Sequence, residues 1–260
     1  MKITIFSGNQ PRHLSLVENL SKISDDVFFV SEVQTVFPGQ ISDRFQTSKV
    51  MNSYFSKVVA SEKRLFGEIN FLPRNVKTLS IKLGDLSWLE KTHLIEALSS
   101  DVFIVFGSSY IKGWLADFLI HNKAINIHMG LSPYYRGSAC NFWASYDNNL
   151  GYVGATIHYL SKGLDSGNML FHCLPNFIDG QSTFDFTMRA VAVAHKGLLD
   201  AINDGTLASM EAVAQDHSKN IRYSRSEDFN DQVAEKFLNR NISLSPCDLA
   251  YPNLINPVFG

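Results

Sequence analysis

Short apolar runs alternate along this chain with stretches whose apolar residues recur every three or four positions. The most constraining run is residues 102–106, Val-Phe-Ile-Val-Phe, which is apolar at every position, as expected of a strand that is covered on both faces. Further strand-like runs stand at residues 3–6, 27–30, 76–81 and 124–128. Because strands that alternate with helices form parallel sheets, the sequence predicts a mostly parallel three-layer α/β fold with helices on both faces of the sheet.

Helical periodicity fills much of the chain between these runs. Residues 11–23, which open on a proline, and residues 51–66 each carry a repeating apolar stripe, and residues 88–98 are also expected to be helical. A long helix is predicted to begin at Ser182, which has an acidic residue three positions on in the pattern of a capping box. The polar residues 34–49 contain Pro-Gly and predict a loop.

Two later runs, residues 155–160 and 169–174, predict a strand pair joined by a glycine-flanked turn. Residues 1–205 are therefore expected to form one large domain, and residues 206–260 a small C-terminal extension. An amphipathic helix is predicted in the extension around residues 229–237. The sequence leaves open whether its apolar face packs on the core or on a second copy in a homodimer.

Composition excludes several classes of protein. The chain carries 23 basic residues against 25 acidic ones, a net charge of −2, and its extension holds five basic and seven acidic residues, so nucleic acid is not an expected partner. No apolar run reaches the ~18 residues of a membrane helix, and the N-terminal run is too short for a secretory signal, so we expect a cytoplasmic protein with no membrane partner. Three cysteines, Cys140, Cys173 and Cys247, form no C-x-x-C pair and predict buried free thiols.

The turn after the first strand argues against a dinucleotide cofactor. Residues 7–12, Ser-Gly-Asn-Gln-Pro-Arg, contain one glycine where the G-x-G-x-x-G fingerprint needs three. The same turn opens a helix next to Arg12 and His13, so it can bind an anion. An arginine and a histidine exposed on a first helical turn are the ordinary alternative.

Polar side chains gather where two of the predicted strands end. Ligands in open α/β sheets bind beyond the carboxyl ends of the strands, so residues 106–111 and the Asn126-x-His128 strand end are expected to share one crevice. Asn126 and His128 point to the same face of their strand. A histidine that is merely hydrogen-bonded at a strand end is the ordinary alternative to a ligand-binding His128. Asp165 lies in the later glycine-flanked turn, residues 163–167, where forming the turn is the ordinary alternative to catalysis. His128 has no second histidine at metal-ligand spacing, so no metal site is predicted.

The combination of these motifs is more specific than any one of them. The Asn-x-His strand end, a proline-containing loop that reaches Gly137 and a later Leu-Asp-x-Gly turn resemble the 10-formyltetrahydrofolate-dependent formyltransferases, which include glycinamide ribonucleotide, methionyl-tRNA and sugar-nucleotide enzymes. The resemblance covers residues 100–175 and implies a Rossmann-like formyltransferase fold. Residues 129–133 depart from it, because they read Met-Gly-Leu-Ser-Pro where the family commonly has Pro-Ser-Leu-Leu-Pro.

The resemblance also implies a role for each part of the crevice. The formyl donor would be 10-formyltetrahydrofolate, and the catalytic residues would be Asn126, His128 and Asp165, with His128 as an imidazolium beside the oxygen that gains negative charge. The folate is expected along Phe106, Gly107, Ser108, Ser109, Tyr110 and Ile111. The acceptor is expected near Asn9, Arg12, His13, Tyr134, Arg136 and Trp143.

An amino-sugar nucleotide is the acceptor that the resemblance favours. The sequence Asn141-Phe142-Trp143 after Arg136-Gly137 is similar to the sugar-nucleotide enzymes, although Phe142 and Trp143 can equally be core residues. The extension is shorter and more acidic than the tRNA-binding barrel of the family's methionyl-tRNA enzymes. Methionyl-tRNA formylation, glycinamide ribonucleotide formylation and a non-catalytic Rossmann-type binding protein are the alternatives.

Overall fold

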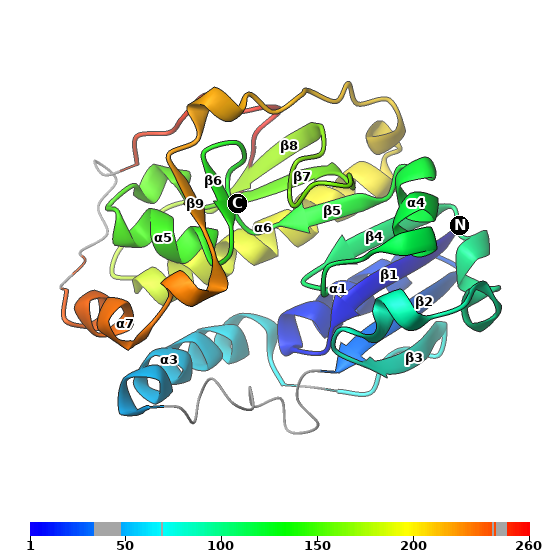
Figure 1. Ribbon diagram of the computed structural model, residues 1–260, viewed down its shortest axis with the longest axis horizontal. Helices are drawn as coiled ribbons and strands as arrows, with labels where there is room; N and C mark the ends of the chain where they lie inside the picture. The colour runs from blue at the N-terminus through cyan, green and yellow to red at the C-terminus, as the bar shows by residue number, and fades with distance from the viewer. Residues whose placement is uncertain (34–47, 69, 241, 243–248) are drawn as a thin grey trace.

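An open sheet forms the centre of the molecule (Figure 1). The computed structural model describes residues 1–33, 48–68, 70–240, 242 and 249–260. Within this part of the chain the main sheet has eight strands in the order β10-β8-β7-β5-β4-β1-β2-β3, and β6 and β9 form a second, two-stranded sheet. The strands are β1 (Lys2–Gly8), β2 (Asp26–Val33), β3 (Val76–Lys82), β4 (Val102–Phe106), β5 (Ile125–His128), β6 (Tyr135–Gly137), β7 (Ala155–Tyr159), β8 (Met169–Leu174), β9 (Arg222–Ser224) and β10 (Val258–Phe259).

The main sheet is parallel except around β7. This strand runs antiparallel to both of its neighbours, β5 and β8, whereas β1 to β5 pair in parallel and β10 pairs in parallel with β8. The mostly parallel fold and the late strand pair predicted from the sequence are therefore confirmed.

Helices cover both faces of the sheet. They are α1 (Pro11–Lys22), α3 (Lys49–Phe66), α4 (Gly113–His121), α5 (Cys140–Tyr146), α6 (Thr183–Asn203) and α7 (Asp231–Leu238). The helices α1 and α6 pack on one face with α3 against them, and α4 packs on the other face (Figure 1). In β4, Ile104 and Phe106 pack in the core beneath α1 and α6, and Phe103 and Val105 pack in the core beneath α4. The apolar run is therefore buried on both faces of the sheet, as predicted.

The long helix begins as its sequence predicts. Ser182 is the N-cap of α6, and its hydroxyl oxygen accepts a hydrogen bond from the backbone N–H of Asp185 at 3.1 Å. The apolar stripe of α6 then faces the sheet, with Met188, Val191 and Leu198 in the core.

Residues 88–98 do not form the predicted helix. Short 3₁₀ turns take its place, at Asp85–Trp88, Lys91–Leu94 and Ala97–Ser99. Trp88 is 82% exposed and Ile95 is 67% exposed, so the apolar side chains do not share one buried face. The Nδ1 atom of His93 accepts a hydrogen bond from the backbone N–H of Glu90 at 3.0 Å, and this local bond closes a turn in place of a longer helix.

The C-terminal extension, residues 206–260, packs on the main fold at several places. β10 extends the main sheet beside β8, and β9 lies beside β6 (Figure 1). The helix α7, which begins two residues after Phe229, buries Ala234 and Phe237 in a core cluster with Phe142. The amphipathic helix therefore packs on the core, the first of the two alternatives that the sequence left open.

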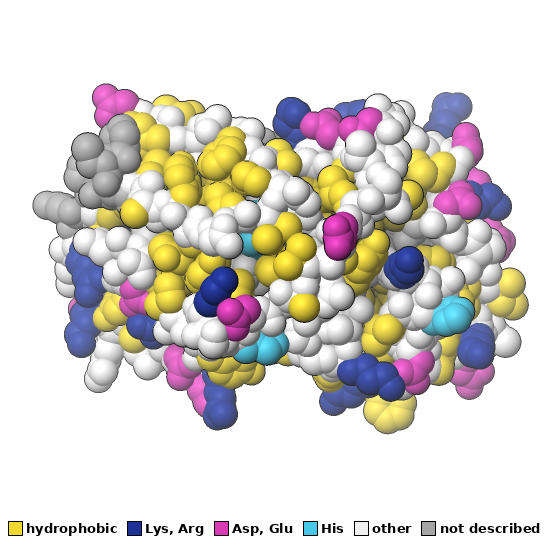
Figure 2. All heavy atoms as spheres, turned by 90° about the horizontal axis from the view of Figure 1, so that it is seen from above, with side chains coloured by type: hydrophobic (Ala, Val, Ile, Leu, Met, Phe, Trp, Pro, Cys, Tyr) yellow, Lys and Arg dark blue, Asp and Glu magenta, His cyan; other side chains and the backbone are white. Residues whose placement is uncertain are grey.

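Neither the surface charges nor the cysteines indicate a particular class of binding partner. Basic and acidic side chains are interspersed over the face in Figure 2. Among the described helices, none combines the length and the apolar character that crossing a membrane requires. Cys140 and Cys173 are buried free thiols, as predicted. Cys247 and residues 34–47 of the predicted loop lie outside the described residues.

Candidate active site

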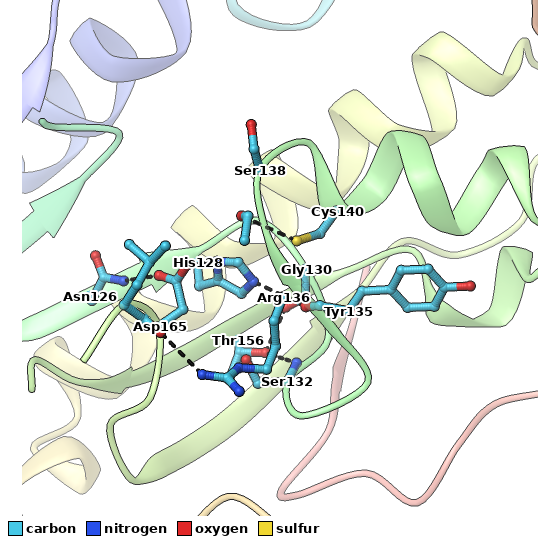
Figure 3. Close-up of polar contacts among 12 residues, drawn as sticks. Asn126, His128, Gly130, Ser132, Tyr135, Arg136, Ser138, Cys140, Thr156 and Asp165 are labelled. Carbon is cyan, nitrogen blue, oxygen red and sulfur yellow. Dashed lines mark hydrogen bonds and ion pairs between the residues drawn. The ribbon is translucent and has the colours of Figure 1, made fainter. Parts of the chain in front are cut away.

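Asn126, His128 and Asp165 converge at the carboxyl end of β5 (Figure 3). Asn126 and His128 are two residues apart on this strand, and Asp165 comes from the turn between β7 and β8. The Nδ1 atom of His128 lies 3.3 Å from Oδ2 of Asp165, and Nδ2 of Asn126 donates a hydrogen bond to Oδ1 of the same carboxylate at 3.3 Å. Asp165 has a φ of 47°, in the left-handed region that aspartate enters more readily than most residues. The structure thus brings together the three residues predicted to be catalytic.

His128 is placed to carry a proton on each ring nitrogen. Its side chain is 6% exposed, Nδ1 faces the Asp165 carboxylate, and Nε2 lies 3.3 Å from the backbone carbonyl oxygen of Tyr135. Burial lowers the pKa of His128, but the Asp165 carboxylate and the Cys140 sulfur raise it, and the resulting pKa lies well above 6.5. Burial raises the pKa of Asp165, but the charge and hydrogen bond of His128 lower it, and the resulting pKa lies below 3.8.

A second histidine orients Asn126. His158 lies opposite Asn126 in the antiparallel β5–β7 ladder, and its Nε2 atom lies 3.0 Å from Nδ2 of Asn126. Burial lowers the pKa of His158 to about 4, so the ring is neutral. Its Nδ1–H then donates to the carbonyl oxygen of Tyr159 at 2.8 Å, and Nε2 accepts from the Asn126 amide. Sequence reasoning missed this role, because only the register of the two strands brings His158 to the site.

A cavity of about 400 Å³ opens beside Asn126, His128 and Asp165. All six residues predicted to hold the folate line it, together with Asn126, His128 and Asp165. Glu32, which is fully buried at the end of β2, accepts hydrogen bonds from the backbone N–H and the hydroxyl of Ser109, at 2.5 and 2.7 Å, and so holds the loop after β4. Sequence reasoning missed Glu32, because nothing in its neighbourhood indicates which loop its carboxylate contacts.

A second cavity of about 370 Å³ meets the first at His128. His128, Met129, Gly137 and Ser138 line both cavities and form the divide between them. Arg12 is the one lysine or arginine among the described residues that line the second cavity, and its Nη1 atom lies 2.8 Å from Oε1 of the buried Glu62. Apolar and aromatic side chains form most of the remaining wall: Tyr54, Phe55, Val58, Phe142, Met188, Val191 and Phe229.

Of the six residues predicted to contact the acceptor, Arg12 lines this cavity and the other five line neither of the two. The structure places His13 and Tyr134 in the core, where they are 2% and 7% exposed. The His13 ring packs edge-on against Phe106, with ring centres 4.8 Å apart, and the Tyr134 hydroxyl donates to the carbonyl oxygen of Asn253 at 3.0 Å. Such burial leaves these side chains almost no surface for an acceptor.

The other three residues differ in their surroundings. Trp143 is 3% exposed and packs under the guanidinium of Arg222, so it is a core residue, the alternative that the sequence left open. Arg136 donates from Nη2 to the carbonyl oxygen of Leu164 at 3.3 Å and so contacts the turn that carries Asp165 (Figure 3). Asn9 follows β1 and lies outside the lining of both cavities.

One of the positions at which the loop after β5 departs from the family sequence, Gly130, is sterically confined. Gly130 stands where the family commonly has serine, and a Cβ atom there would lie 2.5 Å from Cβ of Cys140 and 2.7 Å from Nε2 of His128. The hydroxyl of Thr156 fixes the loop, because it accepts from the N–H of Ser132 at 2.8 Å and donates to the carbonyl oxygen of Gly130 at 2.7 Å (Figure 3). Glycine at this position therefore lets Cys140 and His128 lie against the loop backbone.

Solved structures of other proteins share this fold. The chain resembles a 4-N formyltransferase from Francisella tularensis, with 18% identity and a TM-score of 0.55 over 99% of this chain and 91% of that one. It also resembles the N-formyltransferase of Helicobacter canadensis, which was solved with folinic acid and dTDP-3-aminofucose, with 15% identity and a TM-score of 0.53 over 88% of this chain and 73% of that one.

Sequence comparison agrees with the shared fold. The methionyl-tRNA formyltransferase of Listeria welshimeri is 27% identical over 189 residues, which are 71% of this chain and 57% of that protein, so the chain spans little more than half of this curated relative. The family model described as formyl transferase matches residues 1–202. The chain therefore belongs to the formyl transferase family, as its combined motifs predicted.

Proposed function

We propose that this protein transfers the formyl group of 10-formyltetrahydrofolate to the amine of a nucleotide-linked amino sugar. The observation that carries the proposal is the meeting of two cavities at one catalytic group, since His128 lines both and lies beside Asn126 and Asp165. Transfer between two bound molecules requires such an arrangement, because donor and acceptor must reach the same reacting atom together.

Each catalytic side chain has a distinct task in this reaction. When bound, 10-formyltetrahydrofolate supplies a formyl carbon that an unprotonated amine can attack. His128 presents its charged ring to the formyl oxygen as that oxygen gains negative charge, and the Asn126 amide adds a fixed dipole. Asp165 keeps His128 charged, and its carboxylate can accept the proton that the amine loses and return it to the nitrogen of the leaving folate.

The first cavity fits the folate donor. Its wall is formed by the loop of residues 106–111 and by the apolar side chains of Ile111, Ile127 and Leu160. A flat ring with polar edges suits such a lining, because apolar side chains cover its faces while polar groups of the loop meet its edges. The buried Glu32 holds Ser109 in this loop, so the lining is organised before any ligand binds.

The second cavity supports an acceptor that carries both a ring and a phosphate. Arg12 lies in the first turn of α1, where the helix dipole adds positive potential, and Glu62 and Gln10 orient its guanidinium at 2.8 and 2.7 Å. Aromatic rings supply the apolar part of the wall. The Helicobacter canadensis enzyme, which shares the fold, was solved with a nucleotide-linked amino sugar of this kind.

Methionyl-tRNA is the second candidate acceptor, because the curated relative formylates that substrate according to its name. Binding of tRNA relies on a broad basic surface. The extension is acidic in balance, and both signs of charge are interspersed over the face in Figure 2, which favours the small acceptor. Glycinamide ribonucleotide is an alternative small acceptor, and a non-catalytic binding protein is the alternative of another class.

A mass-spectrometric acceptor screen tests the proposal. The protein is incubated with 10-formyltetrahydrofolate and a panel of 3-amino and 4-amino deoxysugar nucleotides, with methionyl-tRNA and glycinamide ribonucleotide in parallel. We expect one nucleotide sugar to gain a single formyl group in a reaction that Asp165→Asn slows. Formylation of methionyl-tRNA alone would overturn the acceptor assignment, and formylation of no amine would favour the binding protein.

A further inference from the structure

The C-terminal extension reaches back to the divide between the two cavities. The family match ends at residue 202, yet β9 lies beside β6 (Figure 1). Phe229 lines the second cavity. The mechanism described above uses no side chain of the extension. Its contacts with the site therefore call for a separate explanation.

Arg222 anchors the extension to the end of α5. Its guanidinium donates two hydrogen bonds to the carboxylate of Asp147, at 2.8 and 2.7 Å, and lies 4.5 Å from the centre of the Trp143 ring. The Tyr135 hydroxyl donates to the same carboxylate at 3.2 Å. A bidentate pair that also stacks on a ring holds one geometry, so β9 returns to β6 in a fixed register.

Ser224 then holds the divide itself. Its carbonyl oxygen accepts from the backbone N–H of Ser138 at 2.9 Å, and its hydroxyl donates to the carbonyl oxygen of Ser138 at 2.6 Å. Gly137 has a φ of 88°, and a Cβ atom there would lie 2.1 Å from the Ser224 carbonyl oxygen, so the two strands approach this closely only with glycine. Gly137 and Ser138 line both cavities and form part of the wall between them. Ser224 of the extension therefore fixes the position of this wall through its contacts with Gly137 and Ser138.

Phe229 brings an aromatic ring of the extension into the second cavity. The ring is half-buried, and its centre lies 4.7 Å from that of Phe142 and 4.9 Å from that of Tyr54. With Phe55, these rings form an aromatic wall, and aromatic faces bind flat rings well. The acceptor amine must lie near His128, so we expect a different part of the acceptor to meet this wall.

We propose that Phe229 is an acceptor-specificity residue that packs against the base of the acceptor nucleotide, and that Ser224 is a positioning residue that holds Gly137 and Ser138 beside it. This rests on the nucleotide-linked acceptor proposed above. The extension is then part of the active site, although it lies beyond the matched family region.

Ligand binding to the full chain tests the role of Phe229 without any need for turnover. Calorimetry measures the Kd values of dTDP, UDP and 5-formyltetrahydrofolate for the wild type and for Phe229→Ala. The matched control is Phe71→Ala, because Phe71 is fully exposed and lines neither cavity. We expect Phe229→Ala to weaken binding of the better nucleotide about tenfold, as the loss of one stacking ring does, while folate binding and the control stay within about twofold of the wild type.

Hydrogen exchange tests the role of Ser224. Ser224→Ala removes the bond from the hydroxyl to Ser138, so amides of residues 135–142 should exchange about threefold to tenfold faster, with the acceptor KM raised and the donor KM changed less. Ser224→Thr keeps the hydroxyl and should restore both values. Unchanged exchange and unchanged KM values in Ser224→Ala would contradict the positioning role.

The outcomes separate this inference from the proposed function. Nucleotide binding that Phe229→Ala leaves unchanged, or weakens no more than folate binding, would overturn the specificity role. Failure of the wild type to bind either nucleotide would also overturn it, even if formyl transfer to some other amine were found. Nucleotide binding that depends on Phe229, without transfer to any amine, would support the inference and refute the proposed reaction.

Discussion

The Nδ1 atom of His128 lies 3.3 Å from Oδ2 of Asp165, and this contact joins the end of a strand to a turn much later in the chain. The two residues meet because β7 runs antiparallel to β5 and β8 returns beside it, which brings the turn between β7 and β8 to the end of β5. The contact keeps the His128 ring charged, since the carboxylate opposes the effect of burial on the pKa. The charge that the proposed mechanism needs is thus set by a residue of another element.

Removal of the His128 ring should abolish most of the activity. His128→Ala is expected to lower kcat by about 10²–10³-fold, the usual cost of losing one donor to a developing negative charge. Binding of 5-formyltetrahydrofolate, measured by titration, should change far less. His121→Ala is the control, because His121 is exposed and lines neither cavity. Wild-type kcat in His128→Ala would remove this residue from the mechanism.

His158 should act through Asn126. His158→Ala removes the acceptor of the Asn126 amide hydrogen bond and should lower kcat about fivefold, since one hydrogen bond contributes roughly 1 kcal/mol. Both KM values should change less than kcat. A double-mutant cycle checks the coupling: the combined variant with Asn126→Ala should be no slower than Asn126→Ala alone. Additive losses would show that His158 has an independent role.

Glu32 should control affinity for the folate donor. Glu32→Ala leaves the Ser109 N–H and hydroxyl without their acceptor, so the loop of residues 106–111 loses its fixed position. We expect the donor KM to rise about tenfold while the acceptor KM changes less. Ser109→Ala keeps the backbone bond to Glu32 and should show a smaller effect. An equal rise of both KM values in Glu32→Ala would indicate general damage to the fold.

The His128–Asp165 pair should stabilise the fold within a defined pH range. The folded-state pKa of His128 is raised above 6.5, so its contribution is fully present below about 6.5 and is lost as the pH rises through the folded pKa. The folded-state pKa of Asp165 is lowered from 3.8, so its contribution is present above about 3.8 and is lost as the pH falls through the folded pKa. The Tm difference between wild type and Asp165→Asn should therefore be largest between about pH 4 and pH 6.5 and should shrink at alkaline pH. A pH-independent difference would show that the pair is not ionised as described.

The strands β1, β2, β4, β5, β7 and β8 were predictable because their runs of apolar residues reflect burial, whereas β3 is largely exposed although it was predicted, and β10 was not predicted. Residues 102–106 are apolar throughout and lie in a strand that both cores cover. The failed helix at residues 88–98 shows the limit of local periodicity, because spacing alone does not reveal that Trp88 and Ile95 face solvent. The pairing of β6 with β9 depends on contacts between distant segments, which no local pattern encodes.

The residues of the candidate site also fall into those that the sequence predicted and those that it did not. Asn126, His128 and Asp165 stand in motifs whose chemistry distinguishes them from ordinary strand and turn residues, and the structure brings them together. No motif distinguishes Trp143, because an aromatic residue that packs in a core has the same sequence pattern as one that contacts a ligand. Glu32 and Phe229 were missed because strand order and the returning extension, rather than neighbours in the sequence, place them at the cavities.

Asp165 is proposed to keep His128 charged for catalysis, and the pH dependence of formyl transfer in wild type and Asp165→Asn measures this effect. In the wild type, activity at saturating acceptor should be retained well above pH 6.5 and fall only as the pH passes through the raised pKa of His128. In Asp165→Asn that alkaline fall should move toward lower pH, because the opposing effect of burial then prevails, and the maximum rate should also drop. An alkaline fall at the same pH in both proteins, or a wild-type rate in Asp165→Asn, would show that Asp165 does not keep His128 charged for catalysis.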